Sequence, residues 1–269
     1  MAERAATIGI FGGSGFYEFV ENPVRFHVDT PYGPPAAPIH TGTIAGVDIA
    51  FMPRHGDQHE HPAHVTNYRA NMWVMKQLGV DAVISPCAAG SLQPEVKPGE
   101  FVILDQLVDR TKGREDTYYK GPVATHVSIG DPYCSELRSA ASETAGDLGI
   151  GKHDAGTVVV IQGPRFSTRA ESQWFARQGW QVINMTQYPE AALARELEMC
   201  FLGIALITDY DAGVEGVEPA TIDEIVSVFH ANNERLRDLL FALIPKIDAN
   251  RKCECRSALE GARLNTHDF

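Results

Sequence analysis

The sequence predicts an α/β fold in a single domain, with a twisted mixed β-sheet flanked by helices. Short β-branched runs alternate along the chain with amphipathic segments of helical period, which is the pattern of a layered α/β domain. No charge run, internal repeat or low-complexity linker divides the 269 residues. We therefore expect one domain over residues 1–247, followed over residues 248–269 by a polar C-terminal tail with a Cys-x-Cys sequence.

The first half of the chain is predicted to contain several strands and one long helix. The helix is placed at His64–Leu78, because apolar residues recur there at spacings of three and four. The predicted strands are Thr7–Phe11, Val47–Met52, Ala82–Ser85 and Phe101–Gln106.

The second half continues this alternation of strands and helices. Strands are predicted at Thr157–Ile161, Val182–Met185 and Phe201–Thr208, and helices at Arg169–Gln178, Pro189–Leu197 and Thr221–Leu243. Proline is favoured at a helix start, and a threonine cap with an acidic first turn favours the last helix. Nearly every strand is followed by Gly, Ser, Arg, His, Thr or Asp. Because ligands collect at the carboxyl ends of strands in open α/β sheets, we expect these polar residues to form one site.

Composition excludes several classes of function. The chain has 23 Lys and Arg against 35 Asp and Glu, a formal charge of −12, which argues against binding to nucleic acid or to an anionic membrane. It has no apolar run of about 18 residues and no signal-peptide pattern at its start, so we expect a cytoplasmic protein. The five cysteines are scattered and form no Cys-x-x-Cys pair, so neither a disulfide scaffold nor a structural zinc site is predicted.

The glycine-rich segment after the first strand, Gly12–Gly15, is either a phosphate-binding loop or a simple tight turn. Its glycines would let backbone N–H groups approach an anion closely. A dinucleotide fingerprint fails, because Glu18 stands where the third glycine is needed. The sequence therefore disfavours an NAD-binding oxidoreductase.

Three further segments carry candidate ligand-binding side chains. Arg54 and His55 directly follow a strand and offer donors to a phosphate, whereas the histidines around them give no known metal-ligand spacing. Phe166 and Ser167 could contact a flat ring or form only a core contact and a helix cap. Asp209 and Asp211 end an apolar strand at alternate positions, where proximity raises one pKa and provides an acid, although a turn pair is the simpler alternative.

Several long segments, in the same order, resemble the trimeric purine nucleoside phosphorylase superfamily and, within it, the S-methyl-5′-thioadenosine phosphorylases. They include GIFGGSGF, VTNYRAN, CAAGSL, PGEFVILDQLVDRT, GPRFSTRAES and TDYD, and the resemblance runs from about Ile8 to Ile247. It implies the nucleoside phosphorylase fold for residues 1–247. It also implies cleavage of a nucleoside's N-glycosidic bond by inorganic phosphate, a co-substrate, with no cofactor and no metal.

The resemblance assigns roles to individual positions of this sequence. The implied phosphate-binding positions are Ser14, Arg54, His55, Thr186 and the backbone at Ala88. The implied substrate-binding positions are Phe166, Ser167, Met185, Asp209, Asp211, Ile222, Ile225 and His126, with Asp209 and Asp211 as the catalytic acid, singly or as a pair. Cys87 departs from the family, which commonly has Thr there.

The resemblance further implies a substrate and an assembly. Relatives specific for 6-oxopurines generally carry Asn where this chain has Asp, and relatives that accept a 5′-hydroxyl have His where it has Ile222. An apolar wall of Ile222 and Ile225 would favour a buried methylthio group by about 1–2 kcal/mol. S-methyl-5′-thioadenosine is therefore the expected substrate, in methionine and purine salvage. The alternatives are a 6-oxopurine nucleoside or methylthioinosine, another 5′-substituted adenosine, or a silent binding protein.

The family is typically a homotrimer in which a residue corresponding to His126 is borrowed by the neighbouring active site. Its members can also carry a C-terminal extension in which the Cys-x-Cys sequence oxidises. For Cys253 and Cys255 a reducing cytoplasm favours free thiols.

Overall fold

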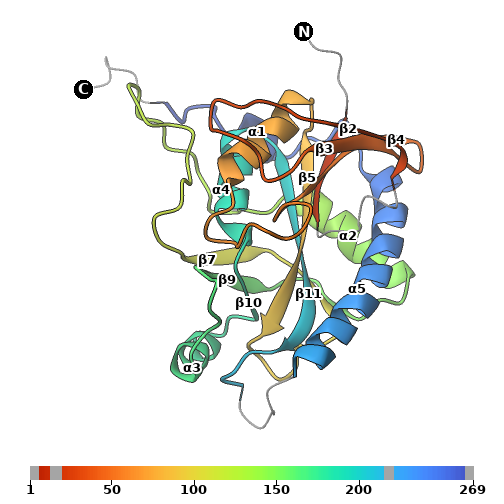
Figure 1. Ribbon diagram of the computed structural model, residues 1–269, viewed down its shortest axis with the longest axis vertical. Coiled ribbons are helices and arrows are strands. Elements are labelled where there is room, and N and C mark those ends of the chain that lie inside the picture. Colours follow the sequence, from red (N-terminus) through yellow and green to blue (C-terminus); the bar gives the residue numbers. More distant parts are fainter. Residues whose placement is uncertain (1–5, 13–19, 215–220, 264–269) are drawn as a thin grey trace.

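The computed structural model describes residues 6–12, 20–214 and 221–263, apart from the side chains of residues 222, 224–226 and 229. In this part of the chain eleven strands form one mixed sheet (Figure 1). The strand order is β2-β3-β4-β1-β5-β10-β9-β7, and β11 joins β5 to β6, which pairs with β8. Helices cover both faces of the sheet, so the predicted α/β fold is confirmed.

The strands are β1 Ile8–Gly12, β2 Glu21–Phe26, β3 Ile39–Ile44, β4 Val47–Pro53, β5 Ala82–Ser91, β6 Phe101–Ile103, β7 Gln106–Arg110, β8 Lys152–His153, β9 Thr157–Ile161, β10 Val182–Asn184 and β11 Cys200–Tyr210. The helices are α1 Tyr68–Gln77, α2 Ser135–Asp147, α3 Arg169–Arg177, α4 Gln187–Glu196 and α5 Ile222–Leu243, with short 3₁₀ turns at Ile244–Lys246 and Glu254–Ser257.

Alternate residues of the central strands serve the two larger of three hydrophobic clusters among the described residues, and the third is a small one around Phe175 of α3. One core packs α1 and α4 against side chains such as Phe11, Val83 and Phe201. The other packs α2 and α5 against the intervening positions, among them Ile10 and Ile84. Strands β5 and β11 are parallel neighbours over most of their lengths and lie between these layers (Figure 1). Their buried, near-continuous apolar sequence is what burial on both faces requires.

Most predicted elements are present, with informative differences. The first predicted helix begins at Tyr68 rather than His64, because the Asn67 side chain accepts the Ala70 N–H and caps it. The predicted strand Phe101–Gln106 is two strands, since the chain leaves β11 after β6 and pairs with β9 as β7. Strand β5 continues to Ser91, well past the predicted end.

Some elements gave no sequence signal. Strand β2 is exposed over most of its length and has no apolar alternation, and α2 buries mainly small residues beside Leu137. The C-terminal segment packs closely on the domain, with Arg251 and Cys255 buried. No helix in the described ranges is long and apolar enough to cross a membrane.

Candidate active site

The ends of several strands meet at one region of the sheet. Gly12 at the end of β1 pairs with Pro53 at the end of β4, and the next N–H, that of Arg54, donates to the Gly12 carbonyl (3.1 Å). Further along, Gly90 of β5 lies beside Asp209 of β11 and pairs with Ile183 of β10. The residues that follow β1 and β4 are therefore adjacent to one another, and so are those at the ends of β5, β10 and β11.

Arg54 belongs to a buried ion-pair network. Its Nε donates to Glu190 Oε1 (2.6 Å) and its Nη2 to Ser85 Oγ (2.8 Å), and Ser85 in turn donates to Glu190 Oε2 (2.7 Å). Burial by itself would lower the pKa of Arg54, but the charge and hydrogen bond of Glu190 raise it, so the guanidinium stays charged. No hydrogen bond to Nη1 is found among the described residues, so this nitrogen remains for an anion. Glu190 thus fixes the orientation of Arg54, the residue predicted to bind phosphate.

A second set of hydrogen bonds extends this network to Cys87. Gln187 at the start of α4 donates to the Ser85 carbonyl (3.0 Å), and Asn184 donates to Cys87 Sγ (3.1 Å). Burial is the main cause that raises the pKa of the Cys87 thiol to about 11, so it is neutral at physiological pH. The thiol is held in place where the family's threonine hydroxyl was expected, and its sulfur accepts hydrogen bonds from the side-chain amides of Asn184 and Gln187.

His55 lies beside Arg54, but its protonation differs from the expected donor role. Its Nδ1 is 2.8 Å from the His61 carbonyl, which can only accept, so Nδ1 carries the proton. Burial, and then the charge of Arg54, lower the pKa of His55 to about 4. The neutral ring therefore presents Nε2 as an acceptor. His55 Nε2 can therefore accept a hydrogen bond from a protonated phosphate oxygen but cannot donate one to an ionised oxygen.

Thr186 and Ala88 occupy positions that suit an anion-binding role. Thr186 is the N-cap residue of α4, and its side chain makes no capping hydrogen bond. Tyr188 has non-helical backbone angles (φ −117°, ψ 133°), so Thr186 lies in a turn that precedes the regular part of the helix, and its hydroxyl is left for a ligand. Ala88 is exposed although its neighbours in β5 are buried, so its backbone is accessible.

The end of β11 carries the two predicted acidic residues. Asp209 Oδ1 accepts a hydrogen bond from the Thr208 hydroxyl (2.6 Å). Burial, with a smaller contribution from the charge of Asp211, raises the pKa of Asp209. Asp211 Oδ2 and Ser167 Oγ are buried and have no hydrogen-bond partner in the described part of the chain. Unpaired buried polar atoms are rare in native proteins, and here they are typical of a site that a ligand completes.

The loop before α3 resolves two alternatives. Phe166 is 78% exposed, so it is not a core residue. The helix cap is Thr168, which forms a capping box with Glu171, so Ser167 is not the cap. A Cβ on Gly163 would lie 2.6 Å from the sulfur of Met185, which brings Met185 close to this loop. The alternative in which Phe166 is a core residue and Ser167 a helix cap is therefore wrong, and both side chains remain available to a ligand.

The remaining predicted site residues are placed differently. His126 is exposed, and its N–H donates to the Ala262 carbonyl (2.8 Å), so within this chain it lies against the C-terminal segment. Ser14 lies outside the described residues, as do the side chains of Ile222 and Ile225.

Sequence reasoning missed the residues that support the site. Glu190, Ser85, Asn184 and Gln187 are buried and polar, and each contacts a predicted ligand or its partner. A glutamate in the first turn of a predicted helix was the one local signal, but it indicated only a favourable helix start.

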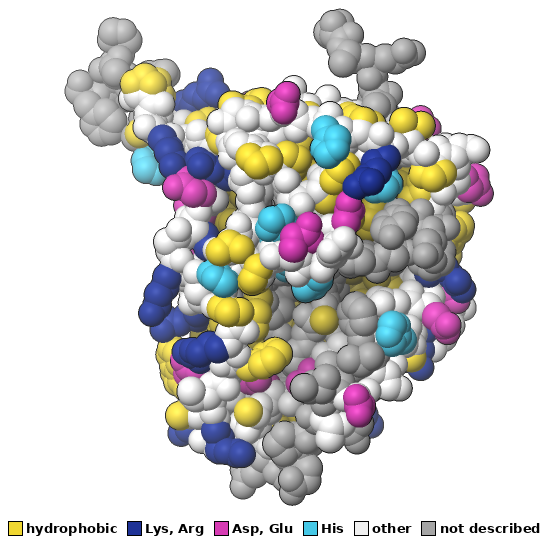
Figure 2. Space-filling view, viewed as in Figure 1, with side chains coloured by type: hydrophobic (Ala, Val, Ile, Leu, Met, Phe, Trp, Pro, Cys, Tyr) yellow, Lys and Arg dark blue, Asp and Glu magenta, His cyan; other side chains and the backbone are white. Residues whose placement is uncertain are grey.

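On the face shown in Figure 2 basic and acidic side chains are interspersed, with several histidines near its centre.

Comparisons with known proteins agree on one family. A family model described as the phosphorylase superfamily matches residues 7–245. A relative from Thermofilum pendens named S-methyl-5′-thioadenosine phosphorylase is 51% identical, over 96% of this chain and 98% of its own. A relative from Streptomyces coelicolor named purine nucleoside phosphorylase is 47% identical, over 95% of each chain.

Solved structures give the same result. A methylthioadenosine phosphorylase sourced from an antarctic soil metagenomic library superimposes with a TM-score of 0.90 at 36% identity, covering 99% of this chain and 95% of its own. A mutant of the adenosine/methylthioadenosine phosphorylase of Schistosoma mansoni, in complex with methylthioadenosine, gives 0.87 at 32% identity, over 96% and 99% of the two chains.

Proposed function

The chain belongs to the phosphorylase superfamily, as the sequence predicted, and from this premise we propose that it is an S-methyl-5′-thioadenosine phosphorylase. It cleaves S-methyl-5′-thioadenosine with inorganic phosphate to adenine and 5-methylthioribose 1-phosphate, a pentosyl transfer that serves methionine and purine salvage. Similar relatives bear this name, and a structural neighbour holds methylthioadenosine. The alternative, a purine nucleoside phosphorylase, has weaker support, because the relative of that name is 47% identical.

The pair at the end of β11 is the observation that carries the choice of base. Burial raises the pKa of Asp209, which favours the protonated form that can donate to the leaving purine, and a protonated leaving group lowers the barrier to bond cleavage. Asp211 has a buried oxygen without a partner, which accepts a hydrogen bond from the 6-amino group of adenine. A 6-oxopurine offers an acceptor at that position and would leave this oxygen unpaired.

The residues around Arg54 hold the attacking phosphate. Arg54, fixed by Glu190, provides the charge and a donor, and Thr186, whose side chain makes no capping hydrogen bond, adds a hydroxyl. His55 Nε2 accepts a hydrogen bond from a phosphate hydroxyl. As the sugar develops positive charge, the bound phosphate stabilises it, so the site works by positioning and electrostatics.

The proposal is tested by phosphorolysis of S-methyl-5′-thioadenosine, adenosine and inosine, measured side by side with and without inorganic phosphate. Phosphate-dependent release of adenine, fastest from S-methyl-5′-thioadenosine, is expected. Faster turnover of inosine would overturn the choice of base while leaving the reaction intact. Turnover without phosphate would overturn the phosphate site. A homotrimer and a cytoplasmic location stay predictions, which sedimentation velocity and localisation in cells would check.

A further inference from the structure

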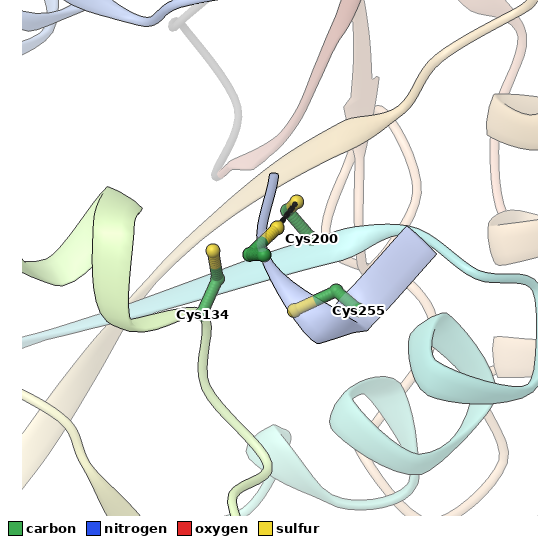
Figure 3. A group of neighbouring side chains, drawn as sticks. Cys134, Cys200 and Cys255 are labelled. Carbon is green, nitrogen blue, oxygen red and sulfur yellow. Dashed lines mark hydrogen bonds between the residues drawn. The ribbon is translucent and has the colours of Figure 1, made fainter. Parts of the chain in front are cut away.

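Four of the five cysteines converge at the end of β11 opposite to Asp209. Cys200 begins β11, Cys134 is the N-cap residue of α2, and Cys253 and Cys255 come from the C-terminal segment. Figure 3 shows the labelled side chains turned toward one another from these separate elements. The proposed reaction uses none of them. Along a strand the eleven residues of β11 span about 35 Å, so the cluster is remote from the site.

The arrangement of the sulfur atoms matches a metal-binding set. All four Sγ atoms lie within 4.8 Å of one another, and those of Cys200 and Cys253 are 3.2 Å apart. Four thiolates around zinc, with Zn–S of about 2.3 Å, lie about 3.8 Å from one another in a tetrahedron. Each sulfur here has three close neighbours, whereas a disulfide would need one. Among the described residues this is the one such group of potential ligands.

The surroundings suit a negatively charged thiolate cluster. Cys134, Cys200 and Cys255 are buried, and Cys253 is partly buried. Arg251 Nε donates to Cys200 Sγ at 3.5 Å, while its Nη2 is paired with Asp81. Cys134 also lies at the start of α2, where the helix dipole favours negative charge. Outer-shell groups that hydrogen-bond to metal ligands fix their orientation, and Arg251 is placed to do this for Cys200.

We propose that Cys134, Cys200, Cys253 and Cys255 form a tetrathiolate site for a thiophilic divalent cation, with zinc as the ion. On binding, the four S–H groups release four protons to solvent and four metal–sulfur bonds form, with no change in oxidation state. The site is structural, because four protein ligands leave no open position for substrate. It fastens the C-terminal segment to α2 and β11, and metal binding contributes to folding free energy.

Spacing along the sequence could not reveal this site. The ligands lie at positions 134, 200, 253 and 255, with a single Cys-x-Cys pair and no Cys-x-x-Cys pair. The search for paired spacings therefore predicted no zinc site. It is the fold, and not local sequence, that brings the sulfurs together.

The test uses the full chain purified under a non-chelating reductant. Elemental analysis is expected to give one zinc ion per chain, and the metal-free protein titrated with Co²⁺ should develop the thiolate charge-transfer and tetrahedral d–d bands. Cys255→Ser should lose the stoichiometric zinc, whereas the control Cys87→Ser, whose thiol lies outside the cluster, should retain it. A chelator should lower the Tm of the wild type and not that of Cys255→Ser.

Two results would overturn the proposal. One is a protein with five free thiols, no bound metal and no cobalt–thiolate band on titration. The other is a pair of disulfides among the four residues, detected as alkylation-resistant cysteines in the protein as isolated from cells. Because the cobalt titration and the chelator shift use the wild type, the proposal is testable even if Cys255→Ser does not fold. Neither measurement depends on phosphorolysis.

Discussion

The two ends of strand β11 use polar groups in opposite ways. At Cys200 the sulfur is completely buried and surrounded by other sulfurs and by an arginine, so its interactions lie within the chain. At Asp209 the strand becomes partly exposed, and the buried oxygen of the nearby Asp211 has no partner in the described part of the chain. At one end of this strand the polar groups are therefore satisfied by the protein itself, or by the proposed zinc ion. At the other end they are left for the proposed substrate. The end that stabilises and the end that reacts can therefore be tested separately.

The largest effect is expected from Asp209→Asn. An amide cannot donate the proton that the leaving purine needs, so kcat/KM for S-methyl-5′-thioadenosine should fall by about 10²–10⁴-fold. The free energy of unfolding at neutral pH should not fall, because burial disfavours the ionised carboxylate at this position and the neutral asparagine avoids that cost. Steady-state kinetics and urea unfolding measure the two quantities on the same preparation.

Asp48→Asn is the matched control for that substitution. Asp48 is an exposed aspartate on β4, outside the candidate site, and the same change there should leave kcat/KM unaltered. Equal activity of wild type and Asp209→Asn would show that this end of β11 does not supply the acid.

The next effect is on the choice of base, tested by Asp211→Asn. The unpaired Oδ2 of Asp211 would be replaced by a group that can also donate, which suits the O6 of a 6-oxopurine. The ratio of kcat/KM for S-methyl-5′-thioadenosine to that for inosine should fall about 10- to 100-fold, the range of one hydrogen bond gained and one lost. An unchanged ratio would remove the argument that Asp211 contacts position 6 of the base.

A third substitution, Gly203→Ala, tests the middle of β11. A Cβ at Gly203 would lie 2.5 Å from Gln187 Oε1 and 2.6 Å from the Tyr133 ring. Either clash displaces a buried group, so the free energy of unfolding should fall by about 1–3 kcal/mol. The control is Gly130→Ala, where a Cβ meets no atom within 4 Å. Equal stabilities of the two variants, measured by urea unfolding, would contradict this close packing.

The contrast between the ends of β11 also shows what sequence can predict. Elements with a clear local signal, such as the β-branched run of β9 and the capped helix α3, were placed almost to the residue. The aspartates at the strand end could be found because a polar residue after an apolar strand is a local signal.

Partners far apart in the chain could not be predicted. Arg54 was expected to bind an anion. Its pairing with Glu190, 136 positions away, could not be predicted, because it depends on how α4 packs against β5. The tautomer of His55 depends on a carbonyl six residues later in a loop with no regular structure. The cysteine cluster depends on three elements meeting. In each case the fold creates the contact, and no residue spacing encodes it.

The smallest expected effect is a difference in the pH dependence of stability between wild type and Asp209→Asn. Burial raises the folded-state pKa of Asp209 above 3.8, its ordinary value, so between these two values the folded protein binds more protons than the unfolded chain. The wild-type free energy of unfolding should therefore fall relative to that of the variant as pH rises from about 3.8 to the folded-state pKa, and the difference should be constant above it. Urea unfolding at a series of pH values measures the difference directly. Curves that stay parallel throughout would mean that Asp209 ionises as freely in the folded protein as in water, and the acid at this end of β11 would then have to be Asp211.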